Sequence, residues 1–290
     1  MVSLKDIQID NRSGASELLT KAAQFLKPQI QRLRDAEDRR RICMDLVVAQ
    51  PRMAPMIHLA NRVIHSNGDR AELLQSIDHF LESRKQSMKT IQNHAAALIR
   101  PNSRVGIYSR SSLVMQCLKA CAEHVTFSVA VCESRPMLEG RTAAQELTHA
   151  GVPVTMMIDA AFSVLTRNSD IILIGADSIS PAAVTNKIGS RPLCLIAKAD
   201  DTPVYCIITP DKFIPDNLQQ PPEPAHNPAE IWETDLSLNF ETPYFESFPP
   251  ELLTGLVTDA GVITASDIQK HIPDIHPDLK LALANLNSHQ

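Results

Sequence analysis

A chain of 290 residues is long for one compact domain, and this length predicts a core domain of ordinary size with a second, smaller unit. With 44% hydrophobic and 21% charged residues, the chain can bury a sizeable core and has the composition of an ordinary soluble protein. The formal net charge of −5 excludes direct nucleic-acid binding driven by a basic surface.

Cysteine usage and hydropathy predict a reduced, cytoplasmic location. The six cysteines are scattered without paired metal-ligand spacing, and the N-terminus has no apolar signal segment. Cys117 and Cys121 stand four residues apart on an expected helix, which could hold a metal but more often reflects two small core residues. No apolar run reaches the roughly 18 residues of a membrane span. We therefore expect no membrane association, no metal and no cofactor.

Residues 1–100 predict a helical N-terminal domain. A first long helix opens near Ser13-Gly14-Ala15 with its apolar residues on one face, and Pro28 should break or bend it. A second helix covers about 34–49, and a third follows a proline-stiffened elbow.

The fourth helix has the clearest local signal in this half of the chain. Asp69 as N-cap and Glu72 three positions later form a capping box. Apolar residues then continue at helical spacing, so this helix should run to about Leu98 and end at Pro101.

Residues 101–290 predict an α/β domain. Short apolar runs alternate with helical spacing, a pattern typical of right-handed crossovers and a parallel, doubly wound sheet. The expected strands are 104–108, 126–132, 153–158, 170–175 and 204–208, with helices over 111–124, 140–150, 160–168 and near 191–200. Residues 215–250 are expected to be irregular and to serve in assembly or in covering a site. A final short helix is expected over about 277–286.

The apolar run 171–174, followed by Gly175-Ala176-Asp177, predicts a central strand of this sheet. Ligands of such sheets lie beyond the carboxyl ends of the strands, where Asp177 stands. Asn186 and Lys187, expected on the next loop, add amide groups and a positive charge that suit an oxygen-rich anionic ligand. Alternatively, Asp177 only caps a helix and 186–189 is only a turn.

Polar side chains follow all five expected strands. Ser109-Arg110-Ser111-Ser112 stands at a helix N-terminus, which favours an anion. We expect the strand ends to face one crevice, where their basic and acidic side chains suit a phosphorylated polyol. These side chains are Arg110, Arg135, Asp159, Asp177, Asp211 and Lys212.

Taken in order, these residues resemble the α, β and δ regulatory subunits of eukaryotic translation initiation factor 2B. The same pattern is similar to two relatives of those subunits, methylthioribose phosphate isomerase and ribose bisphosphate isomerase. The segments that carry the resemblance are Ser13-Gly14-Ala15, Tyr108-Ser109-Arg110, 132–136, Glu139-Gly140, 151–154, 159–161, Gly175-Ala176-Asp177, 186–189 and 258–264.

The resemblance implies a helical domain at 1–100, a Rossmann-like domain at 101–290, a sugar-phosphate pocket between them, and a homodimer or larger homo-oligomer. It also implies that Asp177 is the catalytic residue, if the protein is active. Together with the polar strand ends, it gives a set of candidate ligand-binding residues. These are Ser13, Gly14, Ala15, Ser109, Arg110, Arg135, Glu139, Asn186 and Lys187.

Three departures from the family pattern bear on activity. In the isomerases a Cys and an Asp carry the aldose-to-ketose conversion, and here Ile107 or Ser109 takes the place of the Cys, without an ionisable thiol near neutral pH. Cys132 lies on a different strand. The Arg of the isomerases' N-terminal motif falls at Ser13, and a Gln that contacts substrate falls at Glu139. A carboxylate there could accept hydrogen bonds from sugar hydroxyls but repels a phosphate.

Two functions follow from this pattern. Loss of the thiol with retention of the pocket motifs predicts a non-catalytic or divergent protein, which binds a phosphorylated sugar or nucleotide and acts through assembly or regulation. The alternative is an aldose–ketose isomerase of a sugar phosphate, with Asp177 as one acid/base and another group in place of the Cys.

Residues 240–264 gather aromatic and aliphatic side chains in a chain with only 4% aromatic residues. We expect this cluster to form a symmetric interface with a second copy, or else to pack on the chain's own sheet.

Overall fold

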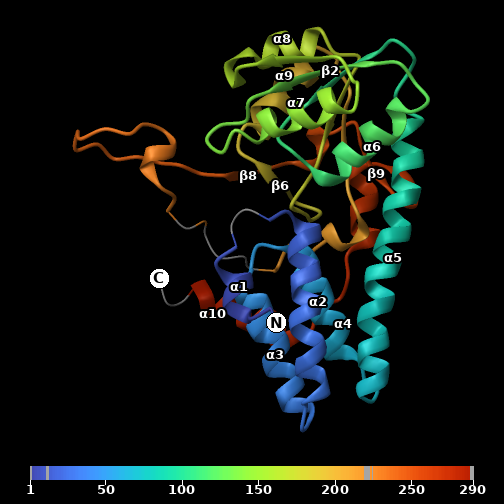
Figure 1. Cartoon of the computed structure of the whole chain (residues 1–290), viewed down its shortest axis with the longest axis vertical. Coiled ribbons are helices and arrows are strands. Elements are labelled where there is room, and N and C mark those ends of the chain that lie inside the picture. The colour runs from blue at the N-terminus through green and yellow to red at the C-terminus, as the bar shows by residue number, and fades with distance from the viewer. Residues whose placement is uncertain (1, 11–12, 219–222, 224, 288–290) are drawn as a thin grey trace.

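The computed structural model describes residues 2–10, 13–218, 223 and 225–287. Helices fill one end of the molecule, and a sheet covered by helices fills the other (Figure 1). The predicted fold class is confirmed, because a helical N-terminal part precedes a mostly parallel, doubly wound sheet. Within the described residues, no helix combines the length and apolar character needed to span a bilayer.

In its described residues, the N-terminal part consists of the helices α1 (Leu4–Gln8), α2 (Ala15–Gln31), α3 (Ala36–Ala49), α4 (Ala54–His65) and α5 (Arg70–Ala96). Pro28 does not break α2, which continues for three residues beyond it. Leu26 and Ile30 on either side of the proline are fully buried, so packing offsets the backbone hydrogen bond that proline removes. The capping box at Asp69 and Glu72 is confirmed.

Helix α5 belongs to both ends of the molecule. Its 27 residues span about 40 Å at 1.5 Å per residue. Leu73 and Ile77, in its first half, pack into the helical core, whereas Ile91 and Ala95 pack into the core beneath the sheet. A single rigid element therefore sets the distance between the two cores.

The main sheet has seven strands: β1 (Arg104–Ile107), β2 (Ser128–Cys132), β3 (Val154–Met157), β4 (Ile171–Ile174), β7 (Val204–Ile207), β9 (Gly255–Thr258) and β10 (Gly261–Ile263). Their order is β10-β9-β7-β4-β1-β2-β3, and every pair is parallel except β9 with β10. The crossover helices are α6 (Ser112–Ala122), α7 (Glu139–His149), α8 (Phe162–Arg167) and α9 (Ser190–Ala199). Strand order reverses between β1 and β4, and a ligand crevice opens at such a reversal.

A second, antiparallel sheet lies beside the first and consists of β5 (Ser178–Ile179), β6 (Val184–Lys187) and β8 (Phe245–Phe248). Asn186 and Lys187 were expected on a loop, but they form the end of β6. They pair there with Glu246 and Phe245 of β8. This pairing joins segments about 60 residues apart, which local sequence patterns do not reveal.

The apolar cluster at 240–264 packs on the chain's own sheet, so the expectation of an interface in this cluster is corrected. Phe248, Leu256 and Val257 are at most 2% exposed and belong to the cores of this molecule. Leu256 and Val257 lie on β9, which pairs with β7 of the main sheet, whereas Phe248 lies on β8, which pairs with β6.

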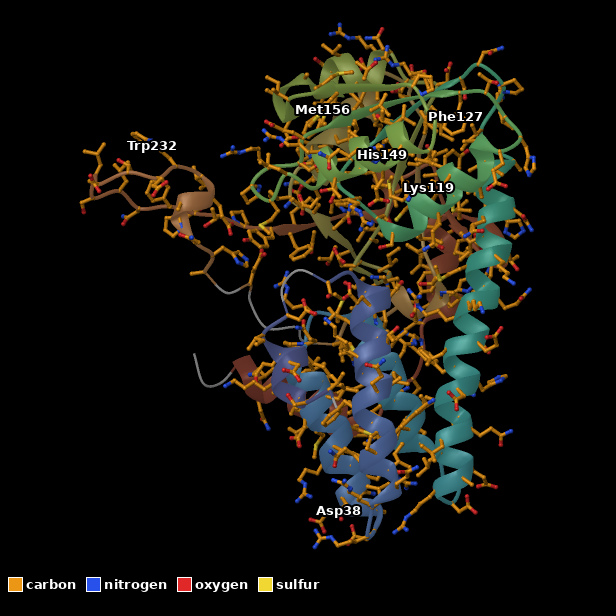
Figure 2. The ribbon with its side chains drawn as sticks, in the orientation of Figure 1. Asp38, Lys119, Phe127, His149, Met156 and Trp232 are labelled. Carbon is orange, nitrogen blue, oxygen red and sulfur yellow. The ribbon has the colours of Figure 1, made fainter. Side chains whose placement is uncertain are left out.

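The end of the chain returns to the helical part. Ile275 and the α10 (Pro277–Asn287) residues Leu279 and Leu283 are fully buried in the core formed by α1 to α5. Residues 225–243 instead project from the sheet end as an arm, on which Trp232 is exposed (Figures 1 and 2). Short 3₁₀ turns complete the fold: η1 (Asp159–Ala161), η2 (Pro210–Lys212), η3 (Pro228–Glu230), η4 (Pro250–Leu252) and η5 (Ala265–His271).

Candidate functional site

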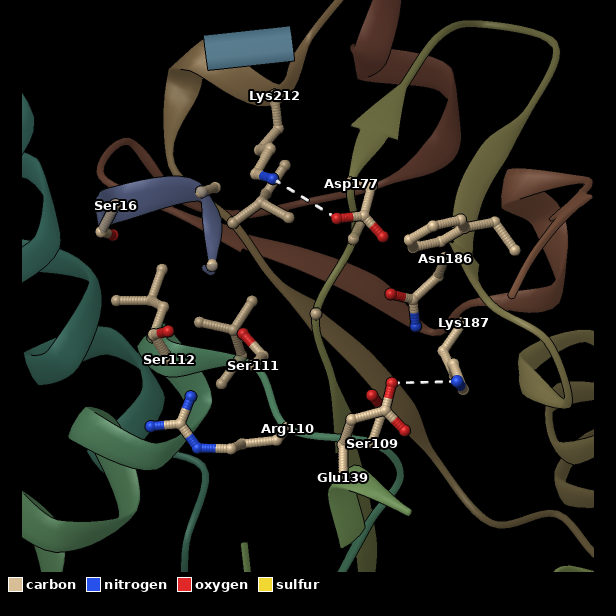
Figure 3. Close-up of a pocket in the computed structure, with 18 of the residues that line it drawn as sticks. Ser16, Ser109, Arg110, Ser111, Ser112, Glu139, Asp177, Asn186, Lys187 and Lys212 are labelled. Carbon is tan, nitrogen blue, oxygen red and sulfur yellow. Dashed lines mark ion pairs between the residues drawn. The ribbon is translucent and has the colours of Figure 1, made fainter. Parts of the chain in front are cut away.

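A cavity of about 530 Å³ lies where the helical part meets the carboxyl ends of β1, β4 and β7. The start of α2 and the middle of α5 close it on the helical side, and Tyr244 and Phe245 close it near β8. Figure 3 shows the side chains of Ser16, Ser111 and Ser112 on one side of this cavity and those of Asn186 and Lys187 on the other.

Two helix N-termini face the cavity. Gly14 caps α2 without a side-chain hydrogen bond, and Ser111 caps α6 through its hydroxyl. The two termini are close, because a Cβ on Gly14 would lie 3.3 Å from Ser112 Oγ. The first amides of a helix have no partner within the helix and carry its positive dipole end, so this side of the cavity suits an anion.

The chain bends sharply after β1 to expose this edge. Ser109 adopts a left-handed backbone conformation, with φ of 60°, and its amide donates to Ser134 Oγ over 2.9 Å. The Tyr108 hydroxyl donates to the Ile188 carbonyl over 2.6 Å and thereby ties the end of β1 to the end of β6. A non-glycine residue in this conformation is held by its surroundings, and such positions are common at functional sites.

Asp177 stands at the end of β4 with its Oδ1 3.9 Å from Lys212 Nζ (Figure 3). Burial raises the pKa of the Asp177 carboxyl, whereas the charges of Lys212, Arg52 and Lys187 act to lower it. The net rise brings this carboxyl closer to the range in which a side chain can take up and release a proton near neutral pH.

Glu139 and Lys187 form an ion pair across the cavity floor, with Nζ 2.9 Å from Oε1 (Figure 3). The Lys187 side chain is only 4% exposed, and its ammonium also lies 5.2 Å from the centre of the Tyr244 ring. Despite these contacts, Lys187 Nζ and Glu139 Oε2 are buried without a hydrogen bond in the described part of the chain. Unsatisfied buried polar atoms of this kind call for a ligand or water.

Every predicted ligand-binding residue except Arg135 lines this cavity, as does Asp177. Arg135 lies at a second cavity of about 380 Å³, where its guanidinium donates to the carbonyls of Glu230 and Ile231. The expectation that all five strand ends share one crevice is therefore corrected. The segments that follow β2 and β3 are joined by hydrogen bonds instead, because the Asp159 carboxylate accepts from the amides of Ser134 and Arg135 over 2.7 Å.

No cysteine is among the described residues that line the cavity. Cys132 is fully buried within β2, and its burial raises the pKa of the thiol to about 12. Of the two positions expected in place of the family thiol, Ile107 is the last residue of β1, and Ser109 lines the cavity.

Arg84 is the main cavity residue that the sequence interpretation missed. It lies on α5 halfway between the buried residues Ile77 and Ile91, seven positions from each. A charge that interrupts an apolar helical stripe was the available signal. Its Nε donates to Asp211 Oδ2 over 2.7 Å and its Nη1 to Ser16 Oγ over 3.1 Å, so it joins α5, η2 and α2 beside the cavity.

The described residues contain no group of three or more His, Cys, Asp or Glu side chains placed to hold a metal ion. The hydrogen-bond donors of the cavity are amides, hydroxyls and cationic side chains, the groups with which proteins in general contact phosphate and hydroxyl oxygens.

Comparison with known proteins gives relatives of two kinds. The chain is 29% identical over 209 residues to ribose 1,5-bisphosphate isomerase from Haloterrigena turkmenica, covering 66% of this chain and 64% of the relative. It is 32% identical over 197 residues to methylthioribose-1-phosphate isomerase from Geobacillus kaustophilus, covering 60% of this chain and 55% of the relative. Both matches thus span less than two thirds of the relatives' length.

Among solved structures, the translation initiation factor eIF-2B of Pyrococcus horikoshii OT3 superposes with a TM-score of 0.76 at 23% identity. The superposition covers 90% of this chain and 95% of that one, and it shows a shared fold. The Initiation factor 2 subunit family matches residues 7–265. With this match over most of its length, the chain belongs to the Initiation factor 2 subunit family.

Proposed function

We propose that this protein binds a phosphorylated sugar or a nucleotide in the cavity between its helical part and its sheet, and acts through assembly or regulation. Lys187 is the observation that carries the proposal: a buried ammonium faces the cavity and makes no hydrogen bond within the described residues. Opposite it, the N-termini of α2 and α6 offer free amides to a phosphoryl group.

The non-catalytic form of this proposal rests on the missing thiol. No cysteine in the described lining supplies an acid/base, and burial raises the pKa of Cys132 well above the neutral range. All six cysteines are free thiols, in keeping with a reducing, cytoplasmic compartment.

An aldose–ketose isomerase is the second candidate function. Asp177 favours it, since a carboxyl with a raised pKa at the edge of a polar cavity can exchange a proton with a sugar. The two curated relatives bear the names of sugar-phosphate isomerases, which supports the same reading.

Calorimetry with ribose 5-phosphate, methylthioribose 1-phosphate, ribose 1,5-bisphosphate and AMP tests the proposal. We expect binding of at least one of them, and we expect Lys187→Met to weaken it by about 1.5–3 kcal/mol, the range for a hydrogen bond to a charged group. Lys198→Met, on the exposed last turn of α9, is the matched control and should bind as the wild type does. Absence of binding to all four ligands would refute the proposal.

Assays of turnover with the two sugar phosphates in the relatives' names distinguish the non-catalytic binding protein from the isomerase. The non-catalytic form predicts no conversion of methylthioribose 1-phosphate or ribose 1,5-bisphosphate by the wild type. Steady conversion that disappears in Asp177→Asn, with ligand binding retained, would establish the isomerase instead.

A further inference from the structure

The Glu139–Lys187 pair presents one unsatisfied donor and one unsatisfied acceptor side by side. Lys187 Nζ and Glu139 Oε2 are buried, make no hydrogen bond within the described residues, and belong to groups 2.9 Å apart. A hydroxyl can accept from the ammonium while it donates to the carboxylate. A phosphate dianion offers acceptors only, and it would place its charge against Glu139. The pair is therefore matched to a hydroxyl.

The remaining charges of the cavity support this reading. The described lining contains four cationic side chains, and a carboxylate lies within 4 Å of each one. The pairs and their distances are Arg84–Asp211 at 2.7 Å, Arg110–Glu146 at 2.6 Å, Lys187–Glu139 at 2.9 Å and Lys212–Asp177 at 3.9 Å. Pairing lowers the net positive charge that these side chains offer to a doubly phosphorylated ligand, although Arg110 shares Glu146 with Lys119, which lies 2.6 Å from it.

The unpaired positive potential lies at the opposite side, where α2 and α6 begin. Gly14 supplies no side-chain cap to α2, and the Glu17 amide donates to the Gly14 carbonyl over 3.0 Å, which leaves the amides of Ala15 and Ser16 without a hydrogen bond among the described residues. Ser16 and Ser112 add hydroxyls close to these amides (Figure 3). This side can hold one phosphoryl group.

We propose that Glu139 is a specificity-determining residue that restricts the cavity to ligands with a single phosphoryl group. The phosphoryl group lies at the N-termini of α2 and α6, and a hydroxyl of the ligand bridges Lys187 and Glu139. This inference rests on the proposed function, because it names which phosphorylated compounds the same cavity accepts.

Matched ligands that differ by one phosphate test the inference. We expect calorimetry to show that the wild type binds ribose 5-phosphate at least roughly tenfold more tightly than ribose 1,5-bisphosphate. Glu139→Gln keeps the shape of the side chain and removes its charge, so Lys187 becomes an uncompensated cation. In this variant we expect affinity for the bisphosphate to rise by roughly tenfold, and affinity for the monophosphate to change by less than about threefold.

Glu133→Gln is the matched control. Glu133 also pairs with a cation, since its Oε2 lies 2.9 Å from Arg141 Nη2, but neither residue lines the cavity. This variant should keep the wild-type preference for one phosphate.

The outcomes separate the inference from the proposed function. If the wild type binds the bisphosphate as tightly as the monophosphate, or if Glu139→Gln changes both affinities alike, the inference is wrong while ligand binding itself stands. If neither sugar phosphate nor AMP binds the wild type, the proposed function fails and the inference fails with it. The wild-type comparison requires no variant, so it decides the matter even if Glu139→Gln does not fold.

Discussion

At the scale of single residues, the ion pair of Arg84 with Asp211 holds the two halves of the molecule together beside the cavity. Both side chains are largely buried, with exposed fractions of 12% and 5%. Burial acts to raise the pKa of Asp211, but Arg84, the Thr209 hydroxyl, His58 and Lys212 hold it below its usual value. The two buried charges are tolerated here because each neutralises the other and they share a hydrogen bond.

Replacement of Arg84 should be far more costly than loss of an exposed ion pair. We expect Arg84→Met to lower the free energy of unfolding by about 3–5 kcal/mol, because Asp211 is left buried without the guanidinium that pairs with it. Lys27→Met, which removes the exposed pair with Asp78, should cost less than about 1 kcal/mol. Urea denaturation at neutral pH measures both values, and similar costs for the two variants would contradict this account.

The same pair predicts how stability depends on pH. Because the pKa of Asp211 is lower in the folded protein, its contribution is complete above the unfolded pKa of about 3.9 and is lost as pH falls below that value. Wild-type stability should therefore drop more steeply on acidification below about pH 4 than that of Asp211→Asn. Parallel acid profiles of the two proteins would exclude Asp211 as the cause.

At the scale of elements, the turn between β6 and α9 fixes the cavity wall. Gly189 has φ of 99°, and its amide donates to Glu246 Oε1 of β8 over 2.6 Å. A Cβ at this position would lie 2.2 Å from the Tyr108 hydroxyl. The close approach lets Tyr108 reach the Ile188 carbonyl, and only glycine has room for it.

Alanine variants of Gly189 and Gly151 distinguish the cost of a steric clash with Tyr108 from the cost of a left-handed backbone conformation. Gly151 also has a positive φ, of 80°, but a Cβ there would meet no atom within 4 Å. Gly151→Ala should cost about 1–2 kcal/mol for the left-handed backbone alone. Gly189→Ala should cost more in urea denaturation and should also weaken ligand binding, since Tyr108 must move from the cavity wall. Equal destabilisation by the two variants would show that Tyr108 moves aside without a loss in the free energy of unfolding.

At the scale of the whole molecule, the projecting arm carries exposed apolar side chains. Trp232, Leu236 and Leu238 are 53%, 61% and 50% exposed. The base of the arm is fixed, because Tyr244 of the cavity wall donates to Glu230 Oε2 over 2.5 Å. A held arm that carries apolar side chains into solvent is typical of an assembly surface.

We expect the protein to form a homodimer or larger homo-oligomer that covers this arm. Light scattering at micromolar concentration should give twice the 32.0 kDa chain mass or a multiple of it. Trp232→Ser should shift the population toward monomer, whereas Leu281→Ser, at a 60% exposed position on α10, should leave the mass unchanged. A monomeric wild type across dilution would rule this assembly out.

Much of the fold was predictable because its signals are local. The capping box at Asp69, the apolar runs of β1, β4 and β7, and the glycine that ends β4 each depend on a few neighbouring residues. The second sheet could not be predicted in this way, because its strands β6 and β8 are separated in the chain by α9 and by β7 of the main sheet. For the same reason, the cluster at 240–264 was open to two interpretations until its burial was known.

The sequence by itself determined which chemical groups follow the strands, because residue identity and the polarity of a parallel sheet place them at one edge. Only the tertiary structure decided which of them meet. Strand order put the ends of β1, β4 and β7 around one cavity and turned Arg135 toward the arm. The tertiary structure also brought Lys187, at the end of β6, to Glu139, at the start of α7, a contact between residues 48 positions apart. Such a contact depends on how separate elements pack, and no pattern of neighbouring residues encodes it.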